Sequence, residues 1–540
     1  MEARACALVF ALSLACGAQG RDSSPPARLA RADTSAGTGP ARWHDYPEAD
    51  ALGYEIELVL DPRRSTLQGE VRYRFKAVQA LREVQLDSVA SKSWSPHFFQ
   101  AHELVARRSG DHLALELETP VAAGQEFAFR AELSGAPPDG LYFGRTRAGE
   151  PCVFTDHYSV RARGWLPCED HPADRAAVCF RLALPEGYQV VCSGALAPLS
   201  APANWVPAGF AGWTGESASE LPTYLFALAA APYARVEEPG DPRLVPHFIY
   251  RPDVERARPA LRFHAAWMQR MEQLIGPYPF EKYCVVQVPT RWGGMENAGN
   301  TWVMEGLFDG ERAGIGTLAH EFAHQWFGDG VGYADWFEVW LSEGFASYFG
   351  PLLDAESGGP ALEQSLREMR ERWRASPEGS ELPVRWKGYA NPDQALNSNT
   401  YPKGAWILHM LRCELGDEAF FAGLRRYYRD NTGRSVHTDE LRAALEAESG
   451  RDLAAFFRQW LDRPGCPELR CRWSASGLSV LQLQAEPYDF LLPLCWKDAA
   501  GAEREGSFRI REASTELELQ GAPISDGELD PHAQLLYRLR

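Results

Sequence analysis

The sequence predicts a multi-domain fold made of an N-terminal antiparallel β-sandwich, a central α+β domain and a small C-terminal β-domain. The chain has 540 residues, which is too long for one compact core and suggests about three or four domains. Apolar and polar residues alternate through much of 43–236, helical spacing dominates 237–463, and alternation returns in 464–540. We place the domain boundaries at these changes of period.

Residues 43–236 contain short runs in which apolar and polar side chains alternate, as they do in half-buried strands. Glycine and proline separate the runs, which is typical of turns. The clearest runs are 54–60 (YEIELVL), 71–75 (VRYRF), 113–117 (LALEL) and 127–131 (FAFRA). A series of short alternating strands predicts an antiparallel β-sandwich.

The period changes near Pro252, and residues 260–274 repeat apolar side chains at helical spacing. Residues 276–280 (GPYPF) end this helix, and residues 284–288 (CVVQV) are typical of a strand. Further helices are predicted at 317–327, 335–349, 401–414 and, after an N-cap at Thr438, 439–447. Residues 478–483 (LSVLQL) alternate again and predict the small β-domain.

The strongest chemical signal is HEFAH at residues 320–324. His320 and His324 are four residues apart on a helix, so both imidazoles can reach one metal ion. Glu321 is turned partly aside, where it can contact a water and act as general base. Glu343 on the next predicted helix can supply a third ligand and leave one tetrahedral position open. HExxH alone also fits an amphipathic helix with polar histidines, but Glu343 favours one Zn²⁺ per chain.

Three segments together resemble one protein family. They are GGMEN at 293–297, HEFAHQWFGDG at 320–330 and WLSEGFASYF at 340–349. The set is similar to the M1 (gluzincin) zinc aminopeptidases, which include aminopeptidase N and leukotriene A4 hydrolase. The resemblance is strongest over 293–349 and extends more loosely over about 45–540. It implies that the central domain is a thermolysin-like metallopeptidase domain.

The same resemblance implies roles for further residues. Tyr401, in the block YPKGA, would donate a hydrogen bond to the oxyanion, although Pro402 replaces a more usual polar residue and would stiffen the backbone. Glu296 would bind the free α-ammonium of a peptide. The other residues of this segment would line the substrate, and they are Gly293, Gly294, Met295 and Asn297. The glycines would let a substrate approach the backbone closely.

Two departures from the family pattern lie near this site. Tyr158 stands where many members have a glutamine, so either Tyr158 or Asp156 replaces that contact, or the amine pocket has a different shape. Ser342 replaces the usual asparagine before the ligand glutamate. Glu305 also matches a family glutamate, and the sequence suggests no role for it.

The sequence therefore predicts a zinc-dependent aminopeptidase that acts on peptides with a free N-terminus. A net charge of −18 argues against nucleic-acid binding. The alternatives are a catalytically silent M1-like binding scaffold, a leukotriene A4 hydrolase-like epoxide hydrolase and an endopeptidase of thermolysin type. The complete set of ligands, base and tyrosine argues against the silent scaffold. The sequence leaves open the preferred N-terminal residue and the oligomeric state.

Residues 1–20 resemble a signal peptide, because a short apolar run follows Arg4. Residues 21–42 are rich in Ala, Gly, Ser, Pro and Arg and predict a flexible tether. Cys16 lies in SLAC, which resembles a lipoprotein cleavage box, so a lipid anchor is one alternative to free secretion. We expect an exported protein that is periplasmic or associated with the cell envelope.

The chain has 11 cysteines. Two of them lie in the leader, and an odd number in the rest of an exported protein leaves at least one free thiol. Neighbouring strands could join Cys152 to Cys168, Cys179 to Cys192, and Cys466 to Cys471. The alternative is that these residues are small buried hydrophobes. No CxxC spacing occurs, so a second metal site is not expected.

Overall fold

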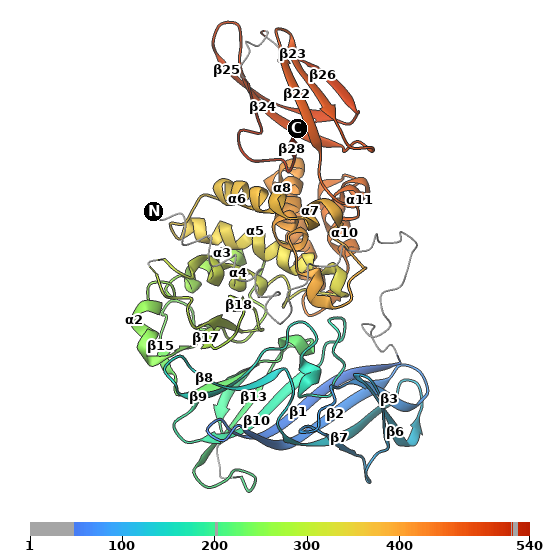
Figure 1. Cartoon of the computed structure of the whole chain (residues 1–540), viewed down its shortest axis with the longest axis vertical. Helices are drawn as coiled ribbons and strands as arrows, with labels where there is room; N and C mark the ends of the chain where they lie inside the picture. The colour runs from blue at the N-terminus through green and yellow to red at the C-terminus, as the bar shows by residue number, and fades with distance from the viewer. Residues whose placement is uncertain (1–47, 200–202, 311, 520, 522–526) are drawn as a thin grey trace, which may run out of the picture.

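The computed structural model describes residues 48–199, 203–310, 312–519, 521 and 527–540 (Figure 1). The predicted signal peptide at 1–20, the tether at 21–42 and Cys16 lie outside the described residues. The described chain forms a β-rich N-terminal part, a central part of helices around a mixed sheet, and a C-terminal lobe of two small sheets. This architecture confirms the predicted fold class. None of the helices in the described ranges has the length and apolar character that crossing a bilayer requires.

The N-terminal part contains three sheets. The largest has the strand order β12-β13-β10-β1-β2-β7-β4, with the bounds β1 Ala49–Asp61, β2 Thr66–Ala77, β4 His97–Phe99, β7 Glu126–Gly135, β10 Ala177–Pro185, β12 Ala195–Pro198 and β13 Phe210–Glu216. The second, β11-β14-β9-β8, has β8 Leu141–Arg145, β9 Pro151–Thr155, β11 Gln189–Cys192 and β14 Leu228–Ala231. The third, β3-β6-β5, has β3 Leu81–Asp87, β5 Ala106–Ser109 and β6 His112–Val121.

These strands follow from the alternating sequence. The four clearest predicted runs lie in β1, β2, β6 and β7. The side chains of Tyr73 and Phe129 point into the core, where their rings stack with centroids 4.6 Å apart. One pair departs from the antiparallel prediction, because β1 and β10 run parallel with Tyr54 opposite Val178. Alternation sets which face is buried but does not set the direction of a distant partner strand.

The central part is built on a sheet with the strand order β15-β16-β17-β19-β18. Its strands are β15 Ala234–Val236, β16 His247–Ile249, β17 Cys284–Val288, β18 Gly294–Met295 and β19 Asn300–Met304. The helices are α2 Val254–Ala257, α3 His264–Leu274, α4 Ile315–His324, α5 Trp340–Glu356, α6 Leu362–Ala375, α7 Glu378–Glu381, α8 Gly404–Leu415, α9 Asp417–Asn431, α10 Thr438–Ser449 and α11 Ala454–Leu461. A small parallel pair joins β20 Gly332–Tyr333 to β21 Ser435–Val436.

The predicted helices are present, but their starts differ. A short 3₁₀ turn, Trp336–Glu338, precedes α5, which therefore begins later than predicted. The predicted N-cap Thr438 is wrong, because its hydroxyl donates to the buried Glu338 carboxylate at 2.5 Å. His437 is the N-cap of α10, and its backbone N–H donates to the Glu440 carboxylate at 3.1 Å. The Thr438 hydroxyl is thus used in a contact 100 residues away and is not free to cap the helix.

The C-terminal lobe stands apart at the top of Figure 1 and contains the sheets β26-β23-β22-β28 and β25-β24-β27. Its strands are β22 Glu468–Ser474, β23 Gly477–Gln482, β24 Phe490–Lys497, β25 Glu503–Ile510, β26 Ser514–Glu518, β27 Gly527–Leu529 and β28 Arg538–Leu539. A buried ion pair joins the lobe to α6, with Arg370 Nη1 2.6 Å from Asp530 Oδ2.

The nine cysteines of the described residues are all free thiols, so the three suggested disulfides do not form. Cys152, Cys168, Cys192, Cys284 and Cys466 are buried. Burial raises the pKa of the Cys152, Cys192 and Cys466 thiols to about 12. Such thiols pack as small hydrophobes and are poor nucleophiles, which is the alternative that the sequence had left open.

Candidate active site

The three predicted metal ligands converge. α4 supplies His320 and His324, and α5 supplies Glu343. The two Nε2 atoms are 3.1 Å apart, and each lies 3.4 Å from Glu343 Oε2. Bonds of about 2.0–2.1 Å to a tetrahedral zinc ion place neighbouring ligand atoms about 3.3 Å apart. The triangle therefore has the size that one zinc ion requires.

One oxygen of this triangle is buried without a hydrogen-bond donor. Glu343 Oε2 is buried and accepts no hydrogen bond, which is costly unless a cation satisfies it. Burial alone would lower the pKa of His324, but the carboxylates of Glu343, Glu296 and Glu321 outweigh it and raise that pKa to about 10. Several buried carboxylates around two imidazoles need positive charge. The residues present fit a divalent zinc ion.

The packing of α5 on α4 fixes the direction of both imidazoles. A Cβ on Gly350 of α5 would lie 2.9 Å from the His320 Cα, so only glycine permits this approach. Ser342 Oγ lies 2.9 Å from His324 Nδ1, and the Phe327 carbonyl oxygen lies 3.3 Å from the same atom. Partners at Nδ1 leave Nε2 free for a metal. Ser342 thus orients His324 from the position where the family pattern usually has asparagine.

Glu321 lies beside the triangle and faces the edge strand β18. A Cβ on Gly294 would lie 2.4 Å from Glu321 Oε1, so the strand backbone and the carboxylate are in close contact. Burial, with Glu296 and Glu343 nearby, holds the pKa of Glu321 well above its usual range. A carboxylate with a raised pKa is a stronger base when ionised. The position suits the predicted general base.

The segment Gly293–Asn297 forms one wall of the site. β18 is the last strand in its sheet and pairs only with β19, through Gly294 to Val303 and Met295 to Trp302, so its other edge can accept an extended peptide. Glu296 follows the strand, and its Oε1 atom is buried without a partner. The Asn297 side-chain nitrogen is likewise buried without a partner. Unsatisfied polar atoms at a strand edge point to a bound polar ligand.

Gln325, which the sequence pattern did not single out, holds this wall in place. Its Nε2 donates to the Glu296 carbonyl oxygen at 2.6 Å and to Asp329 Oδ2 at 2.8 Å. Its Oε1 accepts from the Gly299 backbone N–H at 2.8 Å. The side chain is fully buried next to His324. An amide directly after HEFAH, at the end of α4, was the available signal.

The turn that carries Tyr401 is unusual. Asn399–Lys403 forms a π-helical turn before α8, where the sequence predicted a regular helix start. Pro402 is the cause, because it has no N–H, and the Ser398 carbonyl oxygen accepts instead from Lys403 at 3.2 Å, five residues along. The sequence predicted that Pro402 stiffens the backbone here, and in the structure it changes the hydrogen bonding of the turn that carries Tyr401.

Tyr401 still lies beside the metal ligands. Its ring is stacked on His320, with centroids 6.1 Å apart and planes 14° from parallel. Burial first, and then the Glu343 carboxylate, hold the pKa of Tyr401 well above its usual range. The phenol therefore keeps its proton at neutral pH and can donate a hydrogen bond to an oxygen that gains charge.

Tyr158 lies near the same groups. Its side chain is 5% exposed, and its ring stands edge-on to Tyr224 and Trp336, with centroids 5.6 and 6.0 Å away. Its hydroxyl oxygen lies 3.5 Å from that of Tyr333. Burial and then Glu343 hold the pKa of Tyr158 well above its usual range. Of the two candidates for the glutamine position, Tyr158 is the one that shares its surroundings with the metal ligands.

Asp156 and Glu305 have different partners. Asp156 Oδ2 lies 3.4 Å from Arg161 Nη1, and burial raises the pKa of Asp156 to about 7. Glu305 Oε1 accepts from the Arg147 backbone N–H at 2.6 Å, which ties the β8–β9 hairpin of the N-terminal part to the end of β19. Glu305 therefore has a structural contact that the sequence did not suggest.

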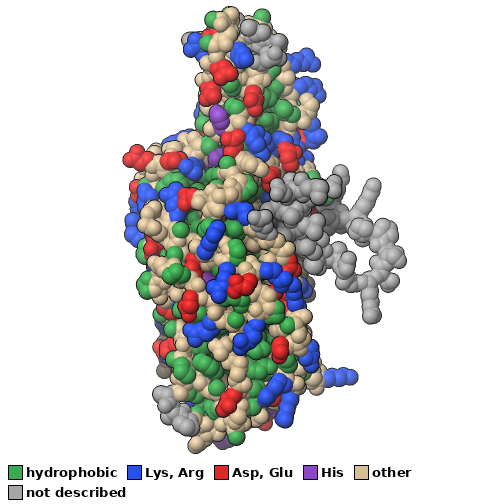
Figure 2. All heavy atoms as spheres, turned by 90° about the vertical axis from the view of Figure 1, so that its left-hand side faces the viewer, with side chains coloured by type: hydrophobic (Ala, Val, Ile, Leu, Met, Phe, Trp, Pro, Cys, Tyr) green, Lys and Arg blue, Asp and Glu red, His purple; other side chains and the backbone are tan. Residues whose placement is uncertain are grey.

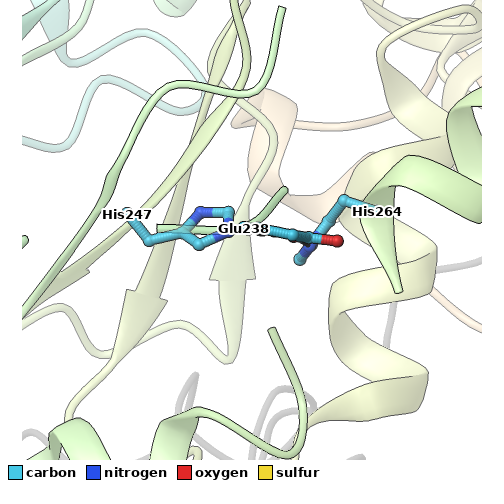
Figure 3. Close-up of side chains that lie close together, drawn as sticks. All are labelled: Glu238, His247 and His264. Atoms are coloured by element: carbon cyan, nitrogen blue, oxygen red, sulfur yellow. Dashed lines mark hydrogen bonds and ion pairs between the residues drawn. The ribbon is translucent and has the colours of Figure 1, made fainter. Parts of the chain in front are cut away.

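A second group of ligand-type side chains lies apart from the triangle. Figure 3 shows Glu238 between the imidazoles of His247 and His264. The Val285 N–H donates to His247 Nδ1 at 3.0 Å, so the proton of this ring sits on Nε2, which lies 3.0 Å from Glu238 Oε2. His264 Nδ1 lies 2.7 Å from the same oxygen, and the Ala265 N–H donates to Oε1 at 3.2 Å.

This hydrogen-bond pattern argues against a metal at Glu238. His247 Nδ1 already accepts a proton donor, so a metal on Nε2 would require the ring to lose both protons. Burial alone would raise the pKa of Glu238, but His264 and His247 lower it to about 2. The group is a buried carboxylate satisfied by three donors.

Two imidazoles on one helix could hold a metal ion together with the carboxylate from the next helix. With an open strand edge beside them, they form the arrangement typical of HExxH peptidases. Comparison with known families agrees. Residues 261–460 match the peptidase family M1 domain, and residues 51–210 match the peptidase M1 N-terminal domain. The chain belongs to peptidase family M1.

Several relatives carry aminopeptidase names. The chain is 30% identical to aminopeptidase N of Streptomyces lividans over 345 residues, which is 59% of this chain and 39% of the relative. It is 29% identical to leucine aminopeptidase 2 of Ajellomyces capsulatus over 59% of this chain and 53% of the relative. It is 27% identical to aminopeptidase B of Rattus norvegicus over 66% and 57%. The match thus spans about half the length of these relatives.

Proposed function

We propose that the chain is a zinc-dependent aminopeptidase that hydrolyses the N-terminal peptide bond of peptides. The observation that carries the proposal is the ligand triangle of His320, His324 and Glu343 beside the unpartnered Glu296 carboxylate. The triangle suits hydrolysis, and the second carboxylate suits a free α-ammonium. The aminopeptidase names of the relatives support the same assignment.

The residues divide the reaction between them. His320, His324 and Glu343 would hold a zinc ion, and the bound ion would supply a Lewis acid for the substrate carbonyl and the attacking water. Glu321 takes a proton from the attacking water as the C–O bond forms. It then gives that proton to the leaving nitrogen as the C–N bond breaks, so that an amino acid and a shortened peptide result. Tyr401 donates a hydrogen bond to the carbonyl oxygen as that oxygen becomes negative.

Glu296 sets the register of the substrate. The free edge of β18 can hydrogen-bond an extended peptide backbone, and Glu296 stands at the end of that edge. A carboxylate at this point binds the α-ammonium and fixes the scissile bond one residue further along. Substrates without a charged N-terminus lose this contact and leave a buried carboxylate unpaired, which is costly.

Zinc content tests the metal part of the proposal. We expect the purified chain to bind one equivalent of zinc, because the ligand atoms of His320, His324 and Glu343 have the separations that one zinc ion requires. His324→Ala removes one corner and should abolish both zinc binding and hydrolysis. His97→Gln, which changes an exposed histidine of β4 beside Glu103, is the control and should keep one equivalent. Metal analysis after dialysis decides, and two equivalents in the unaltered chain would contradict the assignment.

The choice of substrate tests the amine anchor. We expect aminoacyl amides to be cleaved and their N-acetylated forms to be cleaved at least about 100-fold more slowly, since the anchor loses a charged hydrogen bond. Glu296→Ala should raise KM for free-amine substrates and reduce the difference in rate between free-amine and N-acetylated substrates. Steady-state kinetics on both substrate sets, with and without a chelator, measures this difference. Equal cleavage of both forms would indicate an endopeptidase instead.

A further inference from the structure

Glu238, His247 and His264 join three elements of the central part. Glu238 follows β15, His247 begins β16 and His264 begins α3. Val285 of β17 donates to His247, and Ala265 of α3 donates to Glu238. The three side chains are at most 3% exposed. The cluster therefore fastens the N-terminal end of α3 to the sheet that ends in β18.

α3 in turn packs against Phe322 of α4. His264 and Trp267 of α3 have ring centroids 5.7 and 5.9 Å from that of Phe322. Tyr283, one residue before β17, approaches the same ring edge-on at 4.9 Å. Phe322 is fully buried, so its ring is held between α3 and the sheet.

Phe322 points away from the metal ligands of its own helix. At about 100° per residue, its side chain lies about 180° from the mean direction of His320 and His324. The packing around Phe322 therefore sets the distance between β18 and the face of α4 that carries His320 and His324. That distance is tightly constrained, because a Cβ on Gly294 would lie only 2.4 Å from Glu321 Oε1.

We propose that Glu238 and His264 are positioning residues that set the spacing between α4 and the edge strand β18. The inference rests on the proposed function, since this spacing places Glu321 against a bound peptide. Loss of the Glu238 charge removes the strong acceptor that His247 and His264 share and loosens the start of α3. A displacement of about 1 Å caused by a remote mutation can cost about 100-fold in rate.

The test is Glu238→Gln in the full chain, assayed well below its melting temperature. We expect kcat to fall about tenfold while KM changes less than about twofold, because the substrate contacts remain. The zinc dissociation constant, measured by competition with a chelator, should rise about tenfold. The visible spectrum of the cobalt-substituted protein should also shift, since it reports the geometry of the three ligands.

Asp530→Asn is the matched control. It also replaces a buried carboxylate, which pairs with Arg370 at 2.6 Å, but in the C-terminal lobe. It should lower the melting temperature without changing kcat, zinc affinity or the cobalt spectrum. The inference is overturned when Glu238→Gln behaves like this control. A chain that hydrolyses no peptide disproves the proposed function, while zinc affinity and the cobalt spectrum still decide the positioning role.

A second variant covers the case in which Glu238→Gln does not fold. Phe322→Leu keeps an apolar side chain but removes the ring that His264 and Tyr283 contact. We expect the same fall in kcat, with KM nearly unchanged, and the same shift of the cobalt spectrum. Unaltered kcat and spectrum in Phe322→Leu would show that this packing does not set the ligand position.

Discussion

Glu321→Gln is expected to keep zinc bound and to lower kcat by about 10²–10⁴-fold, the range that a positioned general base contributes. Glutamine has nearly the shape of glutamate, so the contact with Gly294 survives. The ligand triangle does not include residue 321, so zinc stays. An amide cannot take a proton from water at neutral pH, and only the proton transfer is lost.

The measurement pairs metal analysis with turnover of a free-amine substrate. Glu356→Gln is a matched control, because Glu356 ends α5 and forms an ion pair with Arg270 at 2.7 Å on the surface. Glu356→Gln should leave the zinc content and the turnover unchanged. A Glu321→Gln variant with full zinc and more than about a tenth of normal kcat would show that another group takes the proton.

The candidate site was largely predictable because its spacing is local. Helical periodicity brings the imidazoles of His320 and His324 together. Glu343 lies on the next helix, and its convergence with them depends on the packing of α5 on α4. Glu296 was assigned through the family resemblance, and the structure places it directly after the edge strand β18, where the sequence suggested only a turn. Gln325 was missed because its value lies in contacts to residues that are brought together only by folding.

Other features of the structure could not be predicted from the sequence for a related reason. The group of Glu238, His247 and His264 comes from three elements, and no spacing in the sequence connects them. The parallel pairing of β1 with β10 depends on the global topology, while alternation shows only which face is buried. Local sequence predicts elements well, and long-range pairing decides how they meet.

Tyr401→Phe is the second variant with a large expected effect. We expect kcat to fall about 10²–10³-fold, the usual cost of losing one donor to a developing oxyanion. KM should change little, because the hydroxyl acts on charge that appears only in the transition state. The phenylalanine ring can still stack on His320, so zinc should stay bound.

The direction of the Tyr401 hydroxyl depends on a turn that is not a regular helix. Pro402 removes a backbone donor and produces the π-helical turn that sets the direction of the phenol. Tyr348→Phe is a matched control, since Tyr348 is buried on α5 and its hydroxyl accepts from Arg412 at 3.2 Å. Its ring packs beside His409 of α8 and Phe420 of α9. A kcat of Tyr401→Phe within about threefold of the unaltered enzyme, and no lower than that of Tyr348→Phe, would contradict this role. The turn would then point the phenol away from the reacting oxygen, and another group would have to donate to the oxyanion.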